Sequence, residues 1–364
     1  KQMNRLLQGD VGSGKTLVAL MSMLIALDNG FQACMMAPTE ILATQHYVTI
    51  SNMTAPLGLK VELLTGSTRA TKRKEIHESL REGSLNLLIG THAVLEEVVQ
   101  FKNLGLVVID EQHRFGVAQR ARVYYKNEVP PHILVMTATP IPRTLAMTAY
   151  AGLETSVIDE LPPGRKPVTT VVISDERRGE VIRRVAAACN EGRQAYWVCT
   201  LIEESDAVQA QAAEDVAREL QSDLAGVDVG LVHGRMKAAE KQETMNRFKN
   251  GSIQLLVATT VIEVGVDVPN ASLMIIENAE RLGLAQLHQL RGRVGRGAEQ
   301  SSCVLLYSQP VGPLARERLN ILRETNDGFR IAEKDLELRG PGEVLGTRQT
   351  GMLQFRVADL ARDQ

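Results

Sequence analysis

Short apolar runs alternate with segments of helical periodicity along almost the entire chain, and this alternation is typical of parallel sheets joined by crossover helices. In the first part of the chain the apolar runs predict strands at residues 33–38, 61–66, 85–92, 104–110 and 132–139. In the second part they predict strands at residues 169–174, 194–199, 227–233, 253–260, 272–277 and 302–307. The pattern therefore predicts an α/β fold with two parallel sheets, each flanked by helices.

The stretch DELPPGRKPV, residues 159–168, separates the two sets of strands. Its three prolines and one glycine break the helical and the strand periodicity alike. We therefore expect a domain boundary here, with residues 1–160 forming the first domain and residues 161–308 forming the second.

The strand pattern stops near Gln309, and residues 309–364 are expected to form a smaller C-terminal appendage. Two helical patterns flank the turn NDG at residues 326–328, and they predict a helical hairpin. The apolar face of this hairpin is expected to include Leu314, Leu319 and Leu322. The stretch RGPGEVLGTRQTG, residues 339–351, is rich in glycine and is expected to form an irregular loop after the hairpin.

The composition of the chain limits what it can bind. Of 364 residues, 44% are hydrophobic and 23% are charged, which is ordinary for a globular protein of two domains. The 41 basic side chains are balanced by 43 acidic ones, so the chain lacks the bulk positive charge that holds nucleic acid by electrostatics alone. Any binding of nucleic acid must therefore be local.

The apolar and cysteine patterns indicate a cytoplasmic protein. No apolar run is long enough to span a membrane, and no signal peptide precedes the first motif, so we expect no membrane partner. The four cysteines show no metal-binding or CxxC spacing, and we expect them to be reduced thiols. The first motif begins only eight residues after Lys1, which suggests that an N-terminal region is missing.

The octapeptide GDVGSGKT matches the phosphate-loop pattern G-x-x-x-x-G-K-[ST], and it lies between a short apolar run and a helical pattern. Glycines let the backbone N–H groups point inward at the phosphates of ATP, and the N-terminus of the helix adds a partial positive charge. The expected ATP-binding residues are Gly9, Gly12, Gly14, Lys15 and Thr16. The lysine would reach the β- and γ-phosphates, and the threonine hydroxyl would bind Mg²⁺. The alternative, an incidental glycine turn, does not account for the strand-loop-helix context.

The predicted strand at residues 104–110 ends on two adjacent carboxylates, Asp110 and Glu111. At the carboxyl edge of a parallel sheet, Asp110 could bind ATP-associated Mg²⁺ while Glu111 orients and deprotonates the attacking water. Seen alone, such residues are as often helix caps, but the phosphate loop favours the catalytic interpretation. His113 has no second clustered metal ligand, so we expect a polar coupling residue rather than a metal site.

The stretch RGRVGRG, residues 291–297, sets three arginines among three glycines. It is either a flexible basic patch that binds nucleic acid or a set of arginines directed at one charge. A helical pattern precedes it and a strand follows it, whereas a disordered tail would be flanked by polar low-complexity sequence. We therefore expect an arginine that neutralises charge on the γ-phosphate, with ATP between the two domains.

Seven segments resemble the motifs of superfamily-two helicases in their order and approximate spacing: GDVGSGKT, APTEILATQH, GTHAV, DEQH, TATPIPRTL, ATTVIEVGVDVPNA and QLRGRVGRG. The resemblance implies two RecA-like domains that hydrolyse ATP and couple the hydrolysis to nucleic-acid contact. In the last motif it implies that Arg293 and Arg296 are arginine fingers and that Gln289 acts beside them. APTEIL and GTHAV look like contacts of the first domain to the sugar-phosphate backbone, although both could be plain strand-to-helix turns.

Two further motifs carry roles by the same resemblance. Thr137 and Thr139 match the motif that couples hydrolysis to strand contact. Gly265 and Asp267 match the motif that bridges ATP and nucleic acid.

The segments DEQHRFG, DELPPGRKPV and DLELRGPGEVLGTRQTG are similar to those of the RecG family of bacterial branched-DNA helicases. The transcription-repair coupling translocases share the C-terminal segment but differ at the phosphate loop and at DEQH. The resemblance implies an ATP-dependent monomeric motor that moves on double-stranded DNA and remodels stalled forks and Holliday junctions in DNA repair and recombination. It maps Arg318, Arg339 and Gln349 onto the family's translocation motif, and it implies that the family's N-terminal wedge domain is missing from this chain.

Two hypotheses about function, each from a different class of protein, compete with that of a DNA helicase. A nucleic-acid-binding scaffold with a purely structural nucleotide site is disfavoured, because Lys15, Asp110 and Glu111 are all present. A DEAD-box RNA helicase is disfavoured by His113 in the DEQH motif and by the sequence TAT in the third motif.

Overall fold

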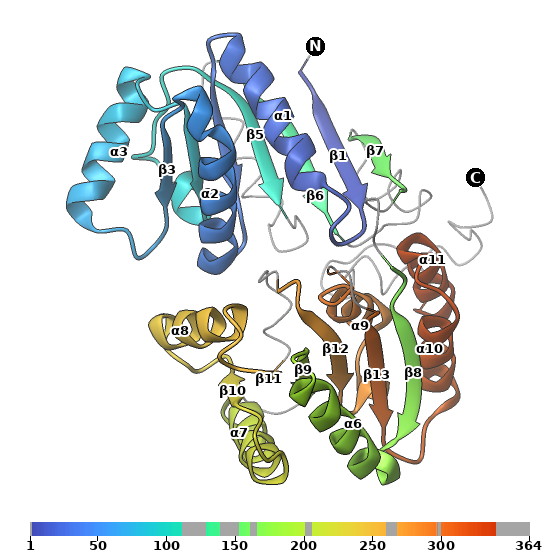
Figure 1. The fold of residues 1–364 in the computed structure, drawn as a ribbon. Coiled ribbons are helices and arrows are strands. Elements are labelled where there is room, and N and C mark those ends of the chain that lie inside the picture. The colour runs from blue at the N-terminus through green and yellow to red at the C-terminus, as the bar shows by residue number, and fades with distance from the viewer. Residues whose placement is uncertain are drawn as a thin grey trace. The chain divides into compact units, whose positions relative to one another are not determined.

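The structure, a computed structural model, describes residues 2–110, 129–138, 153–160, 166–200, 206–259, 268–295, 297 and 300–339. These residues fall into two compact units, the first holding the described residues up to 160 and the second holding those from 166 onward. Each unit contains a parallel sheet with helices packed on it (Figure 1). The predicted α/β class with two parallel sheets is confirmed.

The sheet of the first unit has the strand order β3-β4-β2-β5-β6-β1-β7, and all its strand pairs are parallel. Its strands are β1 Asn4–Gly9, β2 Gln32–Met36, β3 Val61–Leu64, β4 Leu87–Gly90, β5 Leu104–Asp110, β6 His132–Thr137 and β7 Glu154–Ile158. Strands β2, β4 and β5 are buried along their whole length, which explains why they read as uninterrupted apolar runs.

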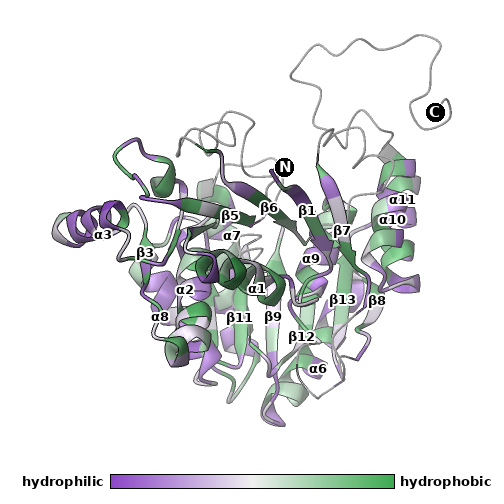
Figure 2. Ribbon diagram, turned by 90° about the horizontal axis from the view of Figure 1, so that it is seen from above, coloured by the Kyte–Doolittle hydropathy of each residue, from purple (hydrophilic) through white to green (hydrophobic). Residues whose placement is uncertain are grey.

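Helices α1 Lys15–Asp28, α2 Glu40–Thr54 and α3 Ala70–Glu82 belong to this unit, with the short 3₁₀ helices η1 Ala55–Leu57 and η2 His92–Leu95. Helix α3 packs on the edge strand β3 and buries only Ile76, His77 and Leu80. Accordingly it is largely hydrophilic, whereas the central strand β5 is hydrophobic over most of its length (Figure 2). The hydropathy of each element thus follows its depth in the unit.

Strand β7 was missed by the sequence pattern. It pairs with β1 at the edge of the sheet, and its first two residues, Glu154 and Thr155, are exposed. An edge strand needs little apolar sequence because its outer side faces solvent. The segment ETSVI is therefore too polar and too short to stand out as an apolar run.

The second unit has the strand order β10-β11-β9-β12-β13-β8, again with parallel pairs throughout. Its strands are β8 Thr169–Ser174, β9 Gln194–Cys199, β10 Val229–Val232, β11 Leu255–Thr259, β12 Ala271–Ile276 and β13 Ser302–Tyr307. Its helices include η4 Asp175–Arg177, α6 Arg178–Asn190, α7 Asp206–Asp223, α8 Ala238–Lys249, η6 Ala279–Arg281 and α9 Leu284–Arg291. All six strands lie within one or two residues of the predicted runs.

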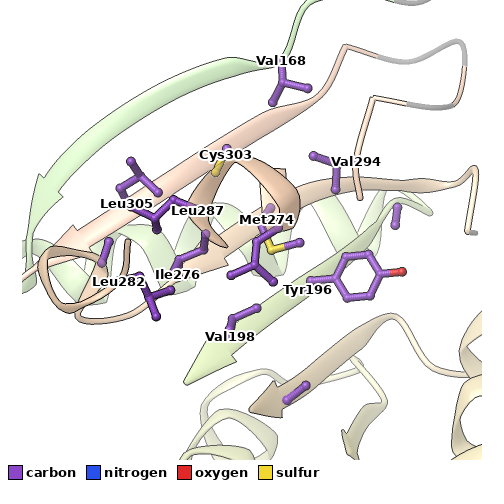
Figure 3. Close-up of a cluster of buried hydrophobic side chains, with 14 of the residues drawn as sticks. Val168, Tyr196, Val198, Met274, Ile276, Leu282, Leu287, Val294, Cys303 and Leu305 are labelled. Atoms are coloured by element: carbon purple, nitrogen blue, oxygen red, sulfur yellow. The ribbon is translucent and has the colours of Figure 1, made fainter. Parts of the chain in front are cut away.

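Alternate residues of β9 bury themselves in different clusters on the two faces of this sheet. Tyr196 and Val198 belong to the cluster that includes α9, and Trp197 belongs to the cluster that includes α6 and α7. Leu282 and Leu287, from the α9 region, lie beside Ile276 and Leu305 in the first cluster (Figure 3). Burial on both faces accounts for the continuous apolar run in the sequence of β9 and makes Trp197 a core residue.

The predicted C-terminal hairpin is confirmed as α10 Pro313–Glu324 and α11 Gly328–Arg339. Helix α10 packs against β8 and α9, and α11 packs against α9 and α10. Leu319 and Leu322 are buried as predicted, but Leu314 is 59% exposed, so its assignment to the apolar face was wrong. Leu314 lies in the first turn and about 140° around the helix from Leu319, so it points away from the sheet.

The expected free thiols are also confirmed: Cys34, Cys189, Cys199 and Cys303 are free and buried. Burial raises the pKa of Cys303 to about 12 and that of Cys189 to about 11. The thiols of Cys189 and Cys303 are therefore protonated at neutral pH and behave as small core residues.

Replacing Leu322 by alanine tests whether the hairpin belongs to the core of the second unit. Because Leu322 is 1% exposed, Leu322→Ala should lower the free energy of unfolding by about 2–5 kcal/mol. Leu314→Ala, in the same helix, is the matched control and should change it by less than about 0.5 kcal/mol. Urea unfolding followed by Trp197 fluorescence measures both; equal effects of the two substitutions would contradict the packing described here.

Candidate nucleotide site

The phosphate loop connects the end of β1 to the start of α1. The amide of Ser13 donates to the carbonyl of Asp10 at 3.1 Å and closes the turn between them. Gly14 precedes α1 with a φ of 93°, a left-handed conformation that favours glycine. The glycine pattern seen in the sequence therefore corresponds to a backbone that curls directly into the helix.

A second glycine allows this loop to fold back on itself. A Cβ atom at Gly9 would lie 2.4 Å from the Ser13 hydroxyl oxygen, closer than real Cβ contacts. The Ser13 hydroxyl is buried and has no hydrogen-bond partner among the residues that the structure describes. A buried hydroxyl of this kind is ready to bind a ligand oxygen, and this observation fits a phosphate group in the loop.

The ammonium group of Lys15 lies inside the loop. Its Nζ donates to the carbonyls of Gly9 and Asp10, both at 2.8 Å, and the side chain is buried. Thr16 follows in the first turn of α1, half-buried, and that turn contains no acidic residue. The positive end of the helix and the fixed ammonium group both favour an anion at this position.

The strand order β5-β6-β1 brings two further predicted residues to the same edge of the sheet. Asp110, the last residue of β5, pairs with Met136 of β6, and Thr137, the last residue of β6, pairs with Gln8 of β1. Both are buried. Since neighbouring strands lie about 4.8 Å apart, Asp110 and Thr137 lie at the carboxyl edge next to the phosphate loop.

Asp110 has a partner that the sequence analysis missed. The Nε2 atom of His46, in α2, lies 2.8 Å from Oδ2 of Asp110, and both side chains are buried. The signal was present in the sequence, because His46 falls in the same helical stripe as Ala43 and Ile50, which are also buried.

The two segments expected to contact a sugar-phosphate backbone follow β2 and β4, which are neighbours in the sheet. The amide of Ala37 donates to the carbonyl of Gly90 at 2.9 Å. Thr39 accepts from the amide of Leu42 at 3.3 Å and caps α2. Thr91 is buried, and its hydroxyl has no hydrogen-bond partner within the described ranges. Both segments are therefore strand-to-helix turns, and Thr91 offers one polar atom to a ligand.

A Mg²⁺ ion fits the oxygen ligands available here. No group of three His, Cys, Asp or Glu side chains that could hold a metal occurs within the described part of the chain. Mg²⁺ is usually held by one or two carboxylates together with waters and substrate phosphates rather than by a cage of protein ligands. The Asp110 carboxylate and the Thr16 hydroxyl are the described groups that would hold it.

In the second unit, Arg291 is a buried structural residue. Its Nη1 donates to the carbonyls of Leu322 at 2.7 Å and Thr325 at 2.9 Å, and its Nη2 lies 3.0 Å from Nδ1 of His288. The carbonyls belong to the end of α10 and the residue that follows it. The first arginine of RGRVGRG therefore joins α9 to the hairpin.

The described residues that follow Arg291 in this segment are fitted closely to the sheet. Val294 is buried in the same cluster as Leu287 (Figure 3). Gly295 has a φ of 81°, and a Cβ there would lie 2.8 Å from a methyl carbon of Val168. Gln289 and Arg293, both half-buried, thus lie on a well-packed support. Residues 291–295 are therefore packed against the sheet.

The remaining predicted residues are placed as follows. Arg318 is half-buried in α10, and its Nη2 donates to the carbonyl of Glu280 in η6 at 3.0 Å. Arg339 is the last residue of α11. The other predicted site residues lie outside the described residues: Glu111, His113, Thr139, Gly265, Asp267, Arg296 and Gln349.

Among the described helices, none combines the length and the hydropathy needed to cross a membrane.

Three families match successive parts of the chain. Residues 1–148 match the DEAD/DEAH box helicase family, residues 179–298 match the helicase conserved C-terminal domain, and residues 325–364 match domain 3, C-terminal, of ATP-dependent DNA helicase RecG. Over its whole length the chain is 63% identical to ATP-dependent DNA helicase RecG of Escherichia coli strain K12 and 61% identical to that of Pasteurella multocida.

The chain spans about half the length of the curated relatives it matches, covering 53% of each of these two proteins. A solved structure of RecG bound to a three-way DNA junction is similar over 100% of this chain and 47% of that one, with a TM-score of 0.81 and 46% identity. The chain therefore resembles RecG proteins both in sequence and in fold over its whole length.

Replacing Arg291 tests its role as a buried link. Arg291→Met leaves the carbonyls of Leu322 and Thr325 without their donor, so the free energy of unfolding should fall by about 2–4 kcal/mol. Arg316→Met changes an exposed arginine of α10 and should cost less than about 0.5 kcal/mol. Both are measured by urea unfolding, and a neutral Arg291→Met would show that the buried guanidinium does not hold the hairpin.

Proposed function

Because the chain belongs to the RecG family of DNA helicases, we propose that it is a motor that hydrolyses ATP with Mg²⁺ and uses the energy to move on double-stranded DNA. The observation that carries this proposal is the buried Lys15 ammonium inside a glycine loop, at the same sheet edge as Asp110. This is the arrangement that P-loop NTPases use to hold phosphates and Mg²⁺.

In the nucleotide site, Lys15 binds the β- and γ-phosphates, and Thr16 and Asp110 hold Mg²⁺. When bound, Mg²⁺ would supply positive charge that offsets part of the negative charge developing in hydrolysis. Glu111 orients the attacking water and accepts its proton. The buried hydroxyl of Ser13 supports this assignment, because it needs an oxygen partner that the described protein residues do not supply.

The other motifs keep the roles that the family resemblance implies. Arg293 and Arg296 stabilise negative charge on the phosphates, with Gln289 beside them. Thr137 and Thr139 couple hydrolysis to strand contact, with His113 as a polar link, and Gly265 and Asp267 bridge ATP and nucleic acid. The proposed domain division is residues 1–160, 161–308 and 309–364.

We propose branched DNA, such as stalled forks and Holliday junctions, as the substrate of the whole protein. The match of residues 325–364 to a RecG domain and the likeness to RecG bound to a three-way DNA junction support this substrate. Arg339 and Gln349 contact duplex DNA in this proposal. Arg318 would act from α10, where its link to Glu280 fixes it. We also propose that the motor works as a monomer in the cytoplasm and that a further wedge domain belongs to the whole protein.

One assay separates this function from its competitors. ATP turnover is measured for the full-length protein without nucleic acid, with single-stranded RNA, and with branched DNA. A RecG-type motor should be stimulated by branched DNA only, an RNA helicase by the RNA, and a structural scaffold by neither.

Lys15→Ala should abolish turnover by weakening ATP binding, whereas Glu111→Gln should abolish turnover while still binding ATP. Normal turnover by Glu111→Gln would refute the role of that carboxylate.

Arg293→Ala tests the arginine fingers. Because a finger acts on charge that develops in the transition state, the turnover rate should fall about a thousandfold while ATP binding stays nearly unchanged. Arg281→Ala, which removes an exposed arginine of the same unit, is the control. Loss of DNA affinity with unchanged intrinsic turnover would instead favour a basic patch.

A further inference from the structure

His46 is a polar residue in the buried stripe of α2. The stripe consists of Ala43, His46, Ile50 and Thr54, at the spacing of one helix face. The hydroxyl of Thr54 donates to the carbonyl of Ile50 at 2.7 Å and so remains within the helix. His46 instead extends from the helix to the end of β5, where its Nε2 meets Oδ2 of Asp110 at 2.8 Å. It is the stripe residue that links α2 to the nucleotide site.

The chemistry of the pair sets the direction of the hydrogen bond. An ionised carboxylate has only acceptor atoms, so Nε2 of His46 must carry a hydrogen and donate it to Asp110. The terminal torsion of an aspartate side chain is soft, so the plane of the carboxylate depends on the partners that hold it. A buried donor on Oδ2 fixes that plane and leaves Oδ1 for another ligand.

Helix α2 is itself anchored near its first residue. The carboxylate of Glu40 accepts hydrogen bonds from the amide and the hydroxyl of Ser67, at 3.1 and 3.0 Å, and this turn follows β3. Thr39 caps the helix from the preceding turn. The histidine is therefore presented by a helix held at its start, and the support of Asp110 comes from α2 and is separate from the phosphate loop.

We propose that His46 is a positioning residue of the nucleotide site: it orients the Asp110 carboxylate so that Oδ1 is presented to Mg²⁺ bound with ATP. This proposal rests on the proposed function, since it requires that Asp110 holds Mg²⁺. It predicts that loss of His46 raises the Mg²⁺ concentration needed for nucleotide binding. The contacts of the phosphate loop with the nucleotide should not change.

The competing interpretation is that His46 is a core histidine that happens to be satisfied by a carboxylate. A residue of that kind affects stability, and its loss should change the unfolding midpoint without changing the response to Mg²⁺. The Mg²⁺ dependence of binding therefore distinguishes the two interpretations, and it does not require turnover.

The experiment measures binding of a fluorescent, non-hydrolysable ATP analogue to the full-length protein while Mg²⁺ is titrated. His46→Leu keeps the bulk of the side chain and removes the donor, and the Mg²⁺ concentration at half-saturation should rise about tenfold. Binding of the analogue in EDTA should be unchanged, because the phosphate loop is intact. His46→Gln keeps an N–H donor and should restore most of the Mg²⁺ response.

Two further variants complete the experiment. His77→Leu is the matched control, because His77 is a buried histidine of α3, which packs on the far edge strand β3; its Mg²⁺ response should equal that of the unmodified protein. If His46→Leu does not fold, His46→Asn takes its place, since its amide is one methylene shorter than that of glutamine and cannot reach Asp110. An unchanged Mg²⁺ midpoint in the folded Leu or Asn variant would overturn the proposal.

The proposed function and the role of His46 can be refuted separately. If the unmodified protein does not bind the analogue in a Mg²⁺-dependent manner, the proposed function itself is wrong. If the unmodified protein binds it and the His46 variants respond to Mg²⁺ in the same way, only the role of His46 is wrong.

Discussion

The parallel pairing of β1 with β6 and of β6 with β5 is the constraint on which the nucleotide site depends. In a parallel sheet all carboxyl ends meet at one edge, so the phosphate loop, Thr137 and Asp110 are brought together by strand order alone. The strands hold this order because their side chains are buried on both faces. The carbonyls of Gly9 and Asp10 hold the ammonium of Lys15 inside the loop.

In the second unit, hydrophobic packing positions the described residues of the segment RGRVGRG. Leu287 and Val294 anchor the segment on either side of Gln289 and Arg293. Arg291 turns inward, and its hydrogen bonds to the end of α10 make the hairpin part of the same body. A displacement of α9 would therefore be transmitted to α10.

Much of the fold was accessible from the sequence because buried parallel strands must be apolar throughout. That rule located all six strands of the second sheet and most of the first. It failed for β7, where an edge position relaxes the demand for apolar residues. The helical pattern in turn failed for Leu314, because a leucine in the first turn of an amphipathic helix can lie away from the buried face. In both cases the sequence pattern is local, whereas burial is decided by neighbours far away in the chain.

By itself, the sequence determined the position of the phosphate loop, because glycine spacing and a lysine at the start of a helix are local requirements of phosphate binding. It also located Asp110 at the end of a strand, since that placement depends only on the apolar run before it. Only the tertiary structure decided that His46 reaches Asp110 and that Arg291 turns into the core. Those contacts join residues 64 and 31 positions apart, and no local pattern records which distant atoms will lie within hydrogen-bond distance.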